Sequence, residues 1–339
     1  MRVFIIQKNE AGQRFDKYLK KRFAHAPSGF LYKMMRKKNI VLNGRRADGT
    51  EQLAAGDEVK VFFSEETFQK FAGLEQASGE YLALRELNVK LTVLYEDEDT
   101  IIINKPSGML SQKAKPDDLS ANEYILAYLI QKGILTAQMM ETFRPSVCNR
   151  LDRNTSGILI AGKTLKGLQQ MSAALKERTV QKYYRCLVEG EVQVPMYLKG
   201  WLKKDEKENR VTVYEDEKAA GVGALPIETE YTPLKSSGGY TYLEVHLITG
   251  RSHQIRAHLA YIGHPIMGDA KYNSRRHTMH TGLKPNQTSG RESGLKRLPV
   301  HSQLLHAYRL EWAGQRTVTA PLPKEFERAL QITGCTVSR

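Results

Sequence analysis

The stretch CNRLDRNTSGILIAGKT, residues 148–164, places one carboxylate, that of Asp152, between two arginines. Arg150 comes two residues before this acid, and Arg153 follows it directly. The NTSG segment and the apolar run after it predict a turn and a buried strand, which would hold the acid rigidly at a sheet edge. The flanking guanidinium groups would keep it ionised. Such a carboxylate can act as a nucleophile, a base or an electrostatic stabiliser, whereas an isolated Asp more often forms a turn or a surface ion pair.

The composition is strongly basic. The chain has 339 residues, enough for about two domains. Its net charge is +14, which favours nucleic acid as a partner, with acidic lipid as the alternative. No apolar run approaches the roughly 18 residues that span a bilayer, so we expect no membrane association. The three scattered cysteines form no CxxC pair, which argues against a disulfide framework or a zinc ribbon and favours the cytoplasm.

Residues 1–63 are predicted to form a small α+β unit that carries much of this charge. Phe15, Leu19 and Phe23 recur at helical spacing. A second helix is expected to end near Asn39, before a short strand and an Asn-Gly turn. The helix end and the turn together favour a phosphate-binding patch over an ordinary solvated helix end. The basic residues of this predicted patch are Lys33, Arg36, Lys37, Lys38, Arg45 and Arg46.

This N-terminal segment resembles the S4 RNA-binding domain. The resemblance lies in RFDKYL, MMRKKNIVLNG and LAAGDEV, and it implies RNA binding without implying a reaction. The polar, acidic residues 64–90 predict a linker. Residues 91–330 are expected to form a second, larger domain, and residues 331–339 a C-terminal tail.

The larger domain contains clear helix signals. Ser120 and Glu123 predict a capping box, Gly133 the end of that helix, and Thr164 the N-cap of the next helix. We find no internal repeat, no G-x-G-x-x-G motif and no Walker loop in the sequence, so it offers no recognisable cofactor motif.

The segment TGRSHQIRAHLAYIGHPIMGDAKY, residues 249–272, predicts a short helix with Ser252 as N-cap and Gly263 as C-cap. His253 and Arg256 are three residues apart and are expected to share a face toward a cleft, where Arg256 can reach an acid. Arg256 as an ordinary surface cation, and an anion bound at the helix N-terminus, stay open. Zinc is disfavoured because the histidines lack H-E-x-x-H spacing and no Cys or Glu completes a ligand set.

The segment QKYYRCLVEG, residues 181–190, predicts a strand. Lys182 and Tyr184 are two apart and would point to the same side, while Tyr183 would point to the other side and pack in the core. Tyr184 can also be a core residue. An aromatic ring beside a basic side chain is equally typical of a site that stacks on a nucleobase.

Together these segments resemble the RluA-type pseudouridine synthase family. NRLDRNTSGILI is similar to the family's HRLDxxTSG motif around its catalytic aspartate. KPSGML, QKYYRCLVEGEV, the TGRSHQIR block and LLHAYRLEW match the other blocks in order, over residues 91–326. The chain looks closest to the RluC- and RluD-type members. It departs from the family at Asn149, where most members have His. Asn keeps hydrogen-bonding groups but does not titrate near neutrality.

The resemblance implies an α+β fold, with a catalytic domain built on a mixed, largely antiparallel sheet, flanking helices and a central cleft. It implies isomerisation of a uridine in structured RNA to pseudouridine, with no cofactor and no metal. Asp152 would be the essential acid, acting as nucleophile or base. Arg256 would hold it ionised and aimed, and Tyr184 would stack on the uracil and take part in the final proton loss.

Further substrate contacts are implied as well. Ile255 would form an apolar wall beside the base, and Arg150 would enter the vacancy left by the flipped nucleotide. Lys182 and His253 would also contact the substrate. The expected partner is ribosomal RNA, 23S or its assembly intermediate, bound by a monomer.

Two other hypotheses stay open. The chain can be a non-catalytic RNA-binding protein such as a ribosome-assembly factor, or, less in keeping with its motifs, a histidine-metal hydrolase. The basic, unpatterned stretch Asn273–Leu298 is expected to be disordered in the free protein and to order on RNA.

Overall fold

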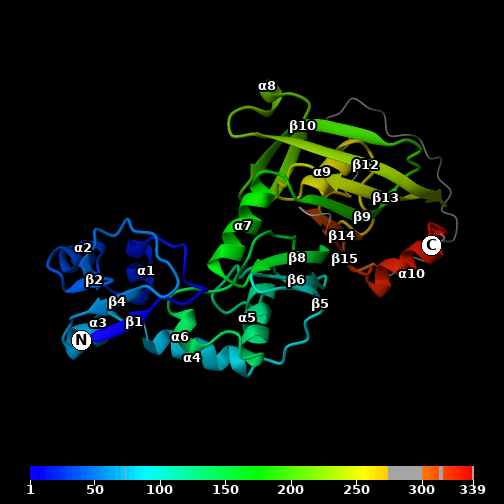
Figure 1. Cartoon of the computed structure of the whole chain (residues 1–339). Helices are drawn as coiled ribbons and strands as arrows, with labels where there is room; N and C mark the ends of the chain where they lie inside the picture. The colour runs from blue at the N-terminus through cyan, green and yellow to red at the C-terminus, as the bar shows by residue number, and fades with distance from the viewer. Residues whose placement is uncertain (73, 274–299, 313–315, 338–339) are drawn as a thin grey trace. The chain divides into compact units, whose positions relative to one another are not determined.

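The computed structural model describes residues 1–72, 74–273, 300–312 and 316–337 (Figure 1). The basic insertion expected at 273–298 lies, beyond its first residue, outside these ranges. The chain divides into two compact units. Unit 1 comprises Met1–Ile103, Ser111–Arg150 and Leu159–Ala173, and unit 2 comprises Asn104–Leu110, Leu151–Ile158 and Ala174–Arg339.

Unit 1 begins with a four-stranded antiparallel sheet in the order β1-β4-β2-β3. Phe15, Leu19 and Phe23 are fully buried in its core, which confirms the predicted helical stripe. The elements are β1 (Arg2–Ile5), α1 (Phe15–Arg22), α2 (Ser28–Arg36), β2 (Ile40–Leu42), β3 (Arg45–Arg46) and β4 (Glu58–Val61).

The linker expected at residues 64–90 is instead helical over most of its length, with α3 (Glu65–Phe71) and α4 (Leu74–Arg85). The Ser64 side chain caps α3 by accepting the Thr67 N–H. Phe68 is buried in the same core as α1 and meets the Phe23 ring edge-on at 5.7 Å. Because the segment is mostly polar, the sequence did not indicate that the Phe68 ring would be buried. The domain boundaries themselves stay predictions.

The predicted signals of α5 (Ala121–Gln131) and α7 (Leu165–Lys176) are present, whereas the short α6 (Ala137–Met140) was not predicted. Ser120 and Glu123 form a complete capping box. Gly133 follows the helix end with φ +69°, and Thr164 accepts the Gly167 N–H at 3.0 Å. The elements with most of their residues here are β5 (Val93–Glu96), β6 (Thr100–Lys105), α5 (Ala121–Gln131), α6 (Ala137–Met140), β7 (Ser146–Val147), β8 (Ser156–Gly162) and α7 (Leu165–Lys176).

Unit 2 is built on an antiparallel sheet in the order β11-β10-β12-β13-β9-β14. The first residues of β8 join it in parallel with β14. The predicted mixed, largely antiparallel sheet is therefore confirmed. The elements are β9 (Gln181–Glu189), β10 (Met196–Asp205), β11 (Arg210–Tyr214), α8 (Glu217–Ala220), β12 (Leu225–Ser237), β13 (Tyr240–Leu247), α9 (Gln254–Tyr261), β14 (Leu305–Trp312), β15 (Arg316–Thr319) and α10 (Lys324–Thr333).

Two helices pack on this sheet through separate apolar clusters. Ala257 and Ala260 of α9 share a cluster with Leu202 of β10, and Figure 1 shows α9 lying against the strands. Phe326 of α10 packs with Tyr242 of β13. The packing of α9 on these strands fixes the position of the helix that carries Arg256.

Tyr183 does not pack in the core as expected. Its ring is half-buried, stacks on His246 with 4.7 Å between ring centroids, and lies 3.8 Å from the Arg309 guanidinium. Strand alternation placed Tyr183 opposite Tyr184 correctly. The side to which it points carries polar and charged residues, however, so the ring is held by stacking and a cation–π contact.

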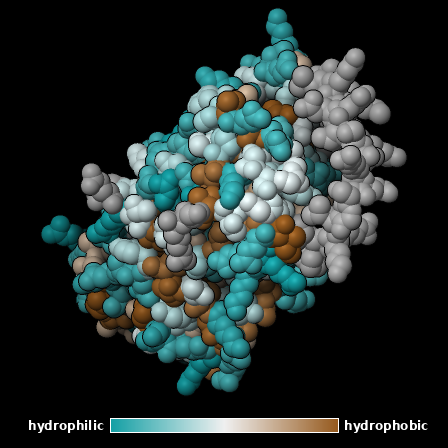
Figure 2. Space-filling view, turned by 90° about the vertical axis from the view of Figure 1, so that its right-hand side faces the viewer, coloured by the Kyte–Doolittle hydropathy of each residue, from teal (hydrophilic) through white to brown (hydrophobic). Residues whose placement is uncertain are grey.

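No helix among the described residues is long and apolar enough to cross a membrane. On the face drawn in Figure 2, hydrophilic and hydrophobic residues are interspersed over the part of the chain that is coloured.

Candidate active site

Asp152 lies in a tight turn directly before β8, and its side chain is one-quarter exposed (25%). Its carbonyl accepts the Thr155 N–H at 3.0 Å. The following residues are tied to the turn after β6: Gly108 N–H donates to the Arg153 carbonyl at 3.0 Å, and the Ser107 hydroxyl donates to the Asn154 carbonyl at 2.9 Å. Two turns that are far apart in sequence thus fix the backbone that carries the acid.

Gly157 is required by the way β8 meets β14. Its φ is +108°, and a Cβ built there would lie 2.2 Å from the Ala307 carbonyl oxygen. Any side chain would strain the backbone and collide with the neighbouring strand. Next to it, the Ser156 hydroxyl is hydrogen-bonded to His306 Nδ1 at 2.8 Å. These contacts hold the end of the Asp152 turn against the sheet.

Lys105 adds a third support for this turn. Its fully buried ammonium group donates to the carbonyls of Pro106, Met109 and Arg153, at 2.9, 2.8 and 3.1 Å. Burial lowers the pKa of Lys105 to about 8, and the charge of Asp152 acts in the opposite direction. The Lys105 side chain is therefore hydrogen-bonded to the backbone of both turns.

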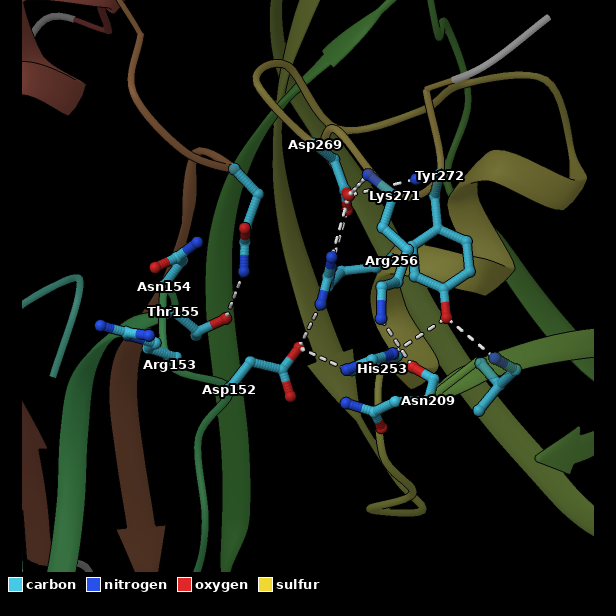
Figure 3. A network of polar contacts seen from close by, with 12 residues as sticks. Asp152, Arg153, Asn154, Thr155, Asn209, His253, Arg256, Asp269, Lys271 and Tyr272 are labelled. Atoms are coloured by element: carbon cyan, nitrogen blue, oxygen red, sulfur yellow. Dashed lines mark hydrogen bonds and ion pairs between the residues drawn. The ribbon is translucent and has the colours of Figure 1, made fainter. Parts of the chain in front are cut away.

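Arg256 of α9 joins two carboxylates (Figure 3). Its Nη1 donates to Asp152 Oδ2 at 2.8 Å, while its Nε and Nη2 donate to the two oxygens of Asp269 at 2.7 and 2.9 Å. Asp269 is completely buried and also accepts the backbone N–H groups of Lys271 and Tyr272. Burial lowers the pKa of Arg256, but the bonds to Asp269 and Asp152 outweigh it and raise the pKa above its usual value.

The partner of Asp152 is therefore not one of its sequence neighbours, as the flanking arginines suggested. Arg153 turns away, and its Nε donates to the Gly108 carbonyl. Arg150 is exposed. The pairing expected between Arg256 and Asp152 is present, and the catalytic roles of both residues stay predictions.

The start of α9 differs from the prediction. The helix begins at Gln254, its N-cap is His253 and not Ser252, and His253 makes no side-chain cap bond. The Gln254 amide oxygen accepts the Thr249 hydroxyl and the Arg251 N–H, so this side chain organises the turn. His253 has φ +55°, a left-handed conformation that costs a histidine about 1–3 kcal/mol.

The His253 ring lies between Asp152 and Tyr272. Its Nε2 is 3.8 Å from Asp152 Oδ2, and its Nδ1 is hydrogen-bonded to the Tyr272 hydroxyl at 2.9 Å. The described part of the chain contains no group of three or more His, Cys, Asp or Glu side chains that could hold a metal ion. His253 is therefore best understood through its contacts with Asp152 and Tyr272.

The other predicted contact residues lie on β9 and α9. Tyr184 is buried, and burial raises its pKa, as does the charge of Asp152, so its ring lies within the electrostatic reach of the acid. Lys182, two residues earlier on β9, is partly buried, and burial lowers its pKa, followed by the charge of Arg178. Ile255 is buried on α9. The six basic residues predicted as an RNA patch in unit 1 are all exposed.

Asn149, which replaces the usual histidine, has a structural contact in unit 1. Its side-chain oxygen accepts the backbone N–H of Ile160 in β8 at 2.9 Å. The residue therefore supplies an acceptor that steadies the strand, a task that requires no titratable ring.

Three residues of this site were not singled out from the sequence: Lys105, Asp269 and Tyr272. All three lie in blocks that matched the family, KPSGML and MGDAKY. One physical signal was available for Asp269. A buried arginine with five N–H donors needs more than one carboxylate oxygen, and Asp269 is an acid within the same segment.

Comparisons with known proteins show the family to which the chain belongs. Residues 99–261 match the family described as RNA pseudouridylate synthase. The ribosomal large subunit pseudouridine synthase C of Vibrio vulnificus is 29% identical over 336 residues, which are 98% of this chain and 96% of that protein. The protein of the same name from Vibrio parahaemolyticus is 30% identical over 329 residues, 96% of this chain and 94% of that protein.

The fold has a known counterpart too. The structure of human RNA pseudouridylate synthase domain containing 4 covers 77% of this chain and 97% of its own, with a TM-score of 0.54 and 19% identity. The chain belongs to the RNA pseudouridylate synthase family. It is an RNA pseudouridine synthase, an isomerase, and the RluA-type resemblance is confirmed.

Proposed function

We propose that Asp152 is the essential acid for isomerising specific uridines in large-subunit ribosomal RNA. The observation that carries the role of Asp152 is its 2.8 Å bond to Arg256, whose guanidinium is itself held by buried Asp269. A fixed cation keeps the carboxylate anionic and oriented. The substrate follows from the relatives named ribosomal large subunit pseudouridine synthase C and from the +14 charge of the chain.

The reaction breaks the C1′–N1 bond of uridine, turns the uracil and joins C5 to C1′. The C5 proton is released and N1 gains a proton, so nothing is oxidised or added. Asp152 either attacks C1′ or removes a sugar proton. Both routes require an anionic oxygen aimed at the ribose, and Arg256 supports this by binding Asp152 Oδ2 and fixing the orientation of the carboxylate.

Neighbouring side chains bind the uracil. Tyr184 stacks on the uracil and Ile255 forms an apolar wall beside it. Arg150 fills the gap in the RNA, where it offsets part of the few kcal/mol that extrusion of a nucleotide costs. Lys182 and His253 contact the flipped nucleotide. The partly buried position of Lys182, beside Gly250, suits contact with a phosphate once RNA displaces water.

The remaining proposals concern the context of the enzyme. An S4-like domain at residues 1–63 holds the RNA through its exposed basic patch. The protein acts as a monomer in the cytoplasm, on 23S RNA or its assembly intermediate.

The test is the variant Asp152→Asn, assayed by tritium release from RNA labelled at uridine C5 and by filter binding. The proposal expects no release above background with nearly unchanged affinity. The exposed acid Asp117 supplies a matched control, Asp117→Asn, which should behave as wild type. Tritium release by Asp152→Asn at the wild-type rate would refute the role of Asp152. A wild-type protein that binds ribosomal RNA without releasing tritium would instead favour a non-catalytic assembly factor.

A further inference from the structure

Asp152 Oδ2 is approached from two directions (Figure 3). Arg256 Nη1 lies 2.8 Å away, and His253 Nε2 lies 3.8 Å away. The His253 side chain is largely buried and its backbone is held in the left-handed region. A histidine kept at a strained position beside the reactive acid suggests a task that another residue type would not perform there.

The Tyr272 hydroxyl connects the backbone to the ring of His253. Its oxygen accepts the backbone N–H of Val211 at 3.0 Å and lies 2.9 Å from His253 Nδ1. When the Tyr272 hydroxyl is the donor in this second contact, Nδ1 is the acceptor. In the neutral ring the proton is then on Nε2, the nitrogen that faces Asp152.

The surroundings favour the neutral ring. Burial is the main factor that lowers the pKa of His253 from its ordinary 6.5, and Arg256 and Lys271 act in the same direction. Asp152 and Asp269 oppose them. Lys271 is held in place by its bond to the Asn209 carbonyl at 2.7 Å. Tyr272 is a further titratable group that contacts the ring.

We propose that His253 is a positioning residue that donates its Nε2 proton to Asp152 when RNA is bound. The 3.8 Å separation exceeds a hydrogen bond and closes on binding, as contacts in active sites commonly do. A neutral donor orients the carboxylate without neutralising it, whereas a protonated ring would weaken the acid as nucleophile or base. This inference rests on the proposed role of Asp152.

Two substitutions of His253 distinguish the position of its N–H donor from the preference of the residue type for a positive φ. His253→Gln places an N–H donor near the Nε2 position and cannot titrate. His253→Asn is better tolerated at positive φ, but its amide reaches only the Nδ1 position. Tyr272→Phe keeps the ring and removes the hydroxyl that contacts His253 Nδ1.

The readout is single-turnover tritium release from uridine-labelled ribosomal RNA as a function of pH. Wild type should lose rate at low pH with a midpoint below 6.5. His253→Gln should stay within about fivefold of the wild-type plateau, the value of one altered hydrogen bond, and its loss of rate should begin at lower pH than in wild type, because residue 253 no longer titrates. His253→Asn should lose about 10²-fold in the single-turnover rate at saturating RNA, because Asp152 is misaligned. Tyr272→Phe should lose roughly tenfold.

Circular dichroism at each pH is needed, because burial lowers the pKa of His258 and of His306 to about 4 and unfolding must be told apart from inactivation. If His253→Asn were as active as His253→Gln, or if folded His253→Gln lost rate at the same pH as wild type, the positioning role would be overturned and the role of Asp152 would be unaffected. Failure of the role of Asp152 is recognised separately, by an active Asp152→Asn enzyme.

Discussion

Asp269 holds Arg256 with both carboxylate oxygens, and this fork turns the third guanidinium nitrogen toward Asp152. The two bonds measure 2.7 and 2.9 Å, and the Asp269 side chain is completely buried. Because the guanidinium is planar and rigid, fixing two nitrogens fixes the direction of the third. The orientation of the Asp152 carboxylate thus depends on a residue that does not touch it.

Removing Asp269 should therefore affect both folding and catalysis. Asp269→Ala removes one of the two carboxylates that pair with the buried Arg256 guanidinium. We therefore expect a loss of about 3–5 kcal/mol in unfolding free energy. Asp269→Asn keeps one acceptor for Arg256 and should therefore lose less stability. Its rate of tritium release should fall about 10²-fold, because Arg256 is misaligned. Urea unfolding and single-turnover kinetics check both values. Asp117→Asn, at an exposed site, should change neither; a fully active Asp269→Asn would show that the fork is unnecessary.

Gly157 is expected to tolerate no side chain. Gly157→Ala drives a Cβ into the Ala307 backbone, so we expect a loss of about 4 kcal/mol or more in unfolding free energy, or failure to fold. Gly263→Ala is the matched control, because Gly263 has φ +88° but open space around its Cβ position. It should lose only about 1–2 kcal/mol, the cost of the left-handed conformation. Equal losses of unfolding free energy in the two variants would show that the structure relieves the collision between the new Cβ and the Ala307 backbone.

Local patterns predicted local structure well. The capping box at Ser120, the helical stripe from Phe15 to Phe23 and the strand alternation at Lys182 and Tyr184 all depend on neighbours within a few residues. Each was present as expected. Local sequence singled out Asp152 and Arg256, and the family resemblance paired them, since two residues 104 positions apart could not have been paired by spacing alone.

Features that depend on which segments meet in space were missed. The ammonium group of Lys105 is held by hydrogen bonds to three carbonyl oxygens, one of which belongs to a residue 48 positions away in the sequence. Tyr183 looked like a core residue because the sequence does not say what covers the second face of the sheet. Ser252 looked like an N-cap, but Gln254 makes competing bonds to Thr249 and Arg251. In each case a tertiary contact outweighed the local preference.

Lys105 predicts a pH dependence of stability. Its pKa is about 8 in the folded protein and 10.5 in the unfolded chain, so the unfolded chain binds more protons between these values. Stability therefore rises as pH increases from about 8 to 10.5. Urea unfolding should show the stability difference between wild type and Lys105→Met growing in favour of wild type by on the order of 2 kcal/mol across this window. Exposed Lys207→Met should show no such trend, and a flat difference for Lys105→Met would contradict the lowered pKa.

The exposed basic patch of unit 1 should contribute to RNA affinity and not to chemistry. In the double variant Lys37→Ala/Arg45→Ala, the removal of each interaction with a phosphate should reduce the slope of log affinity against log salt by about 0.7–0.9. The single-turnover rate at saturating RNA should stay unchanged, because neither side chain belongs to the Asp152 site. Filter binding of ribosomal RNA over a salt series measures the slope. The control Lys203→Ala/Lys204→Ala removes two exposed charges from β10, and an equal change of slope in both variants would mean that the charge of the whole chain, and not this patch, holds the RNA.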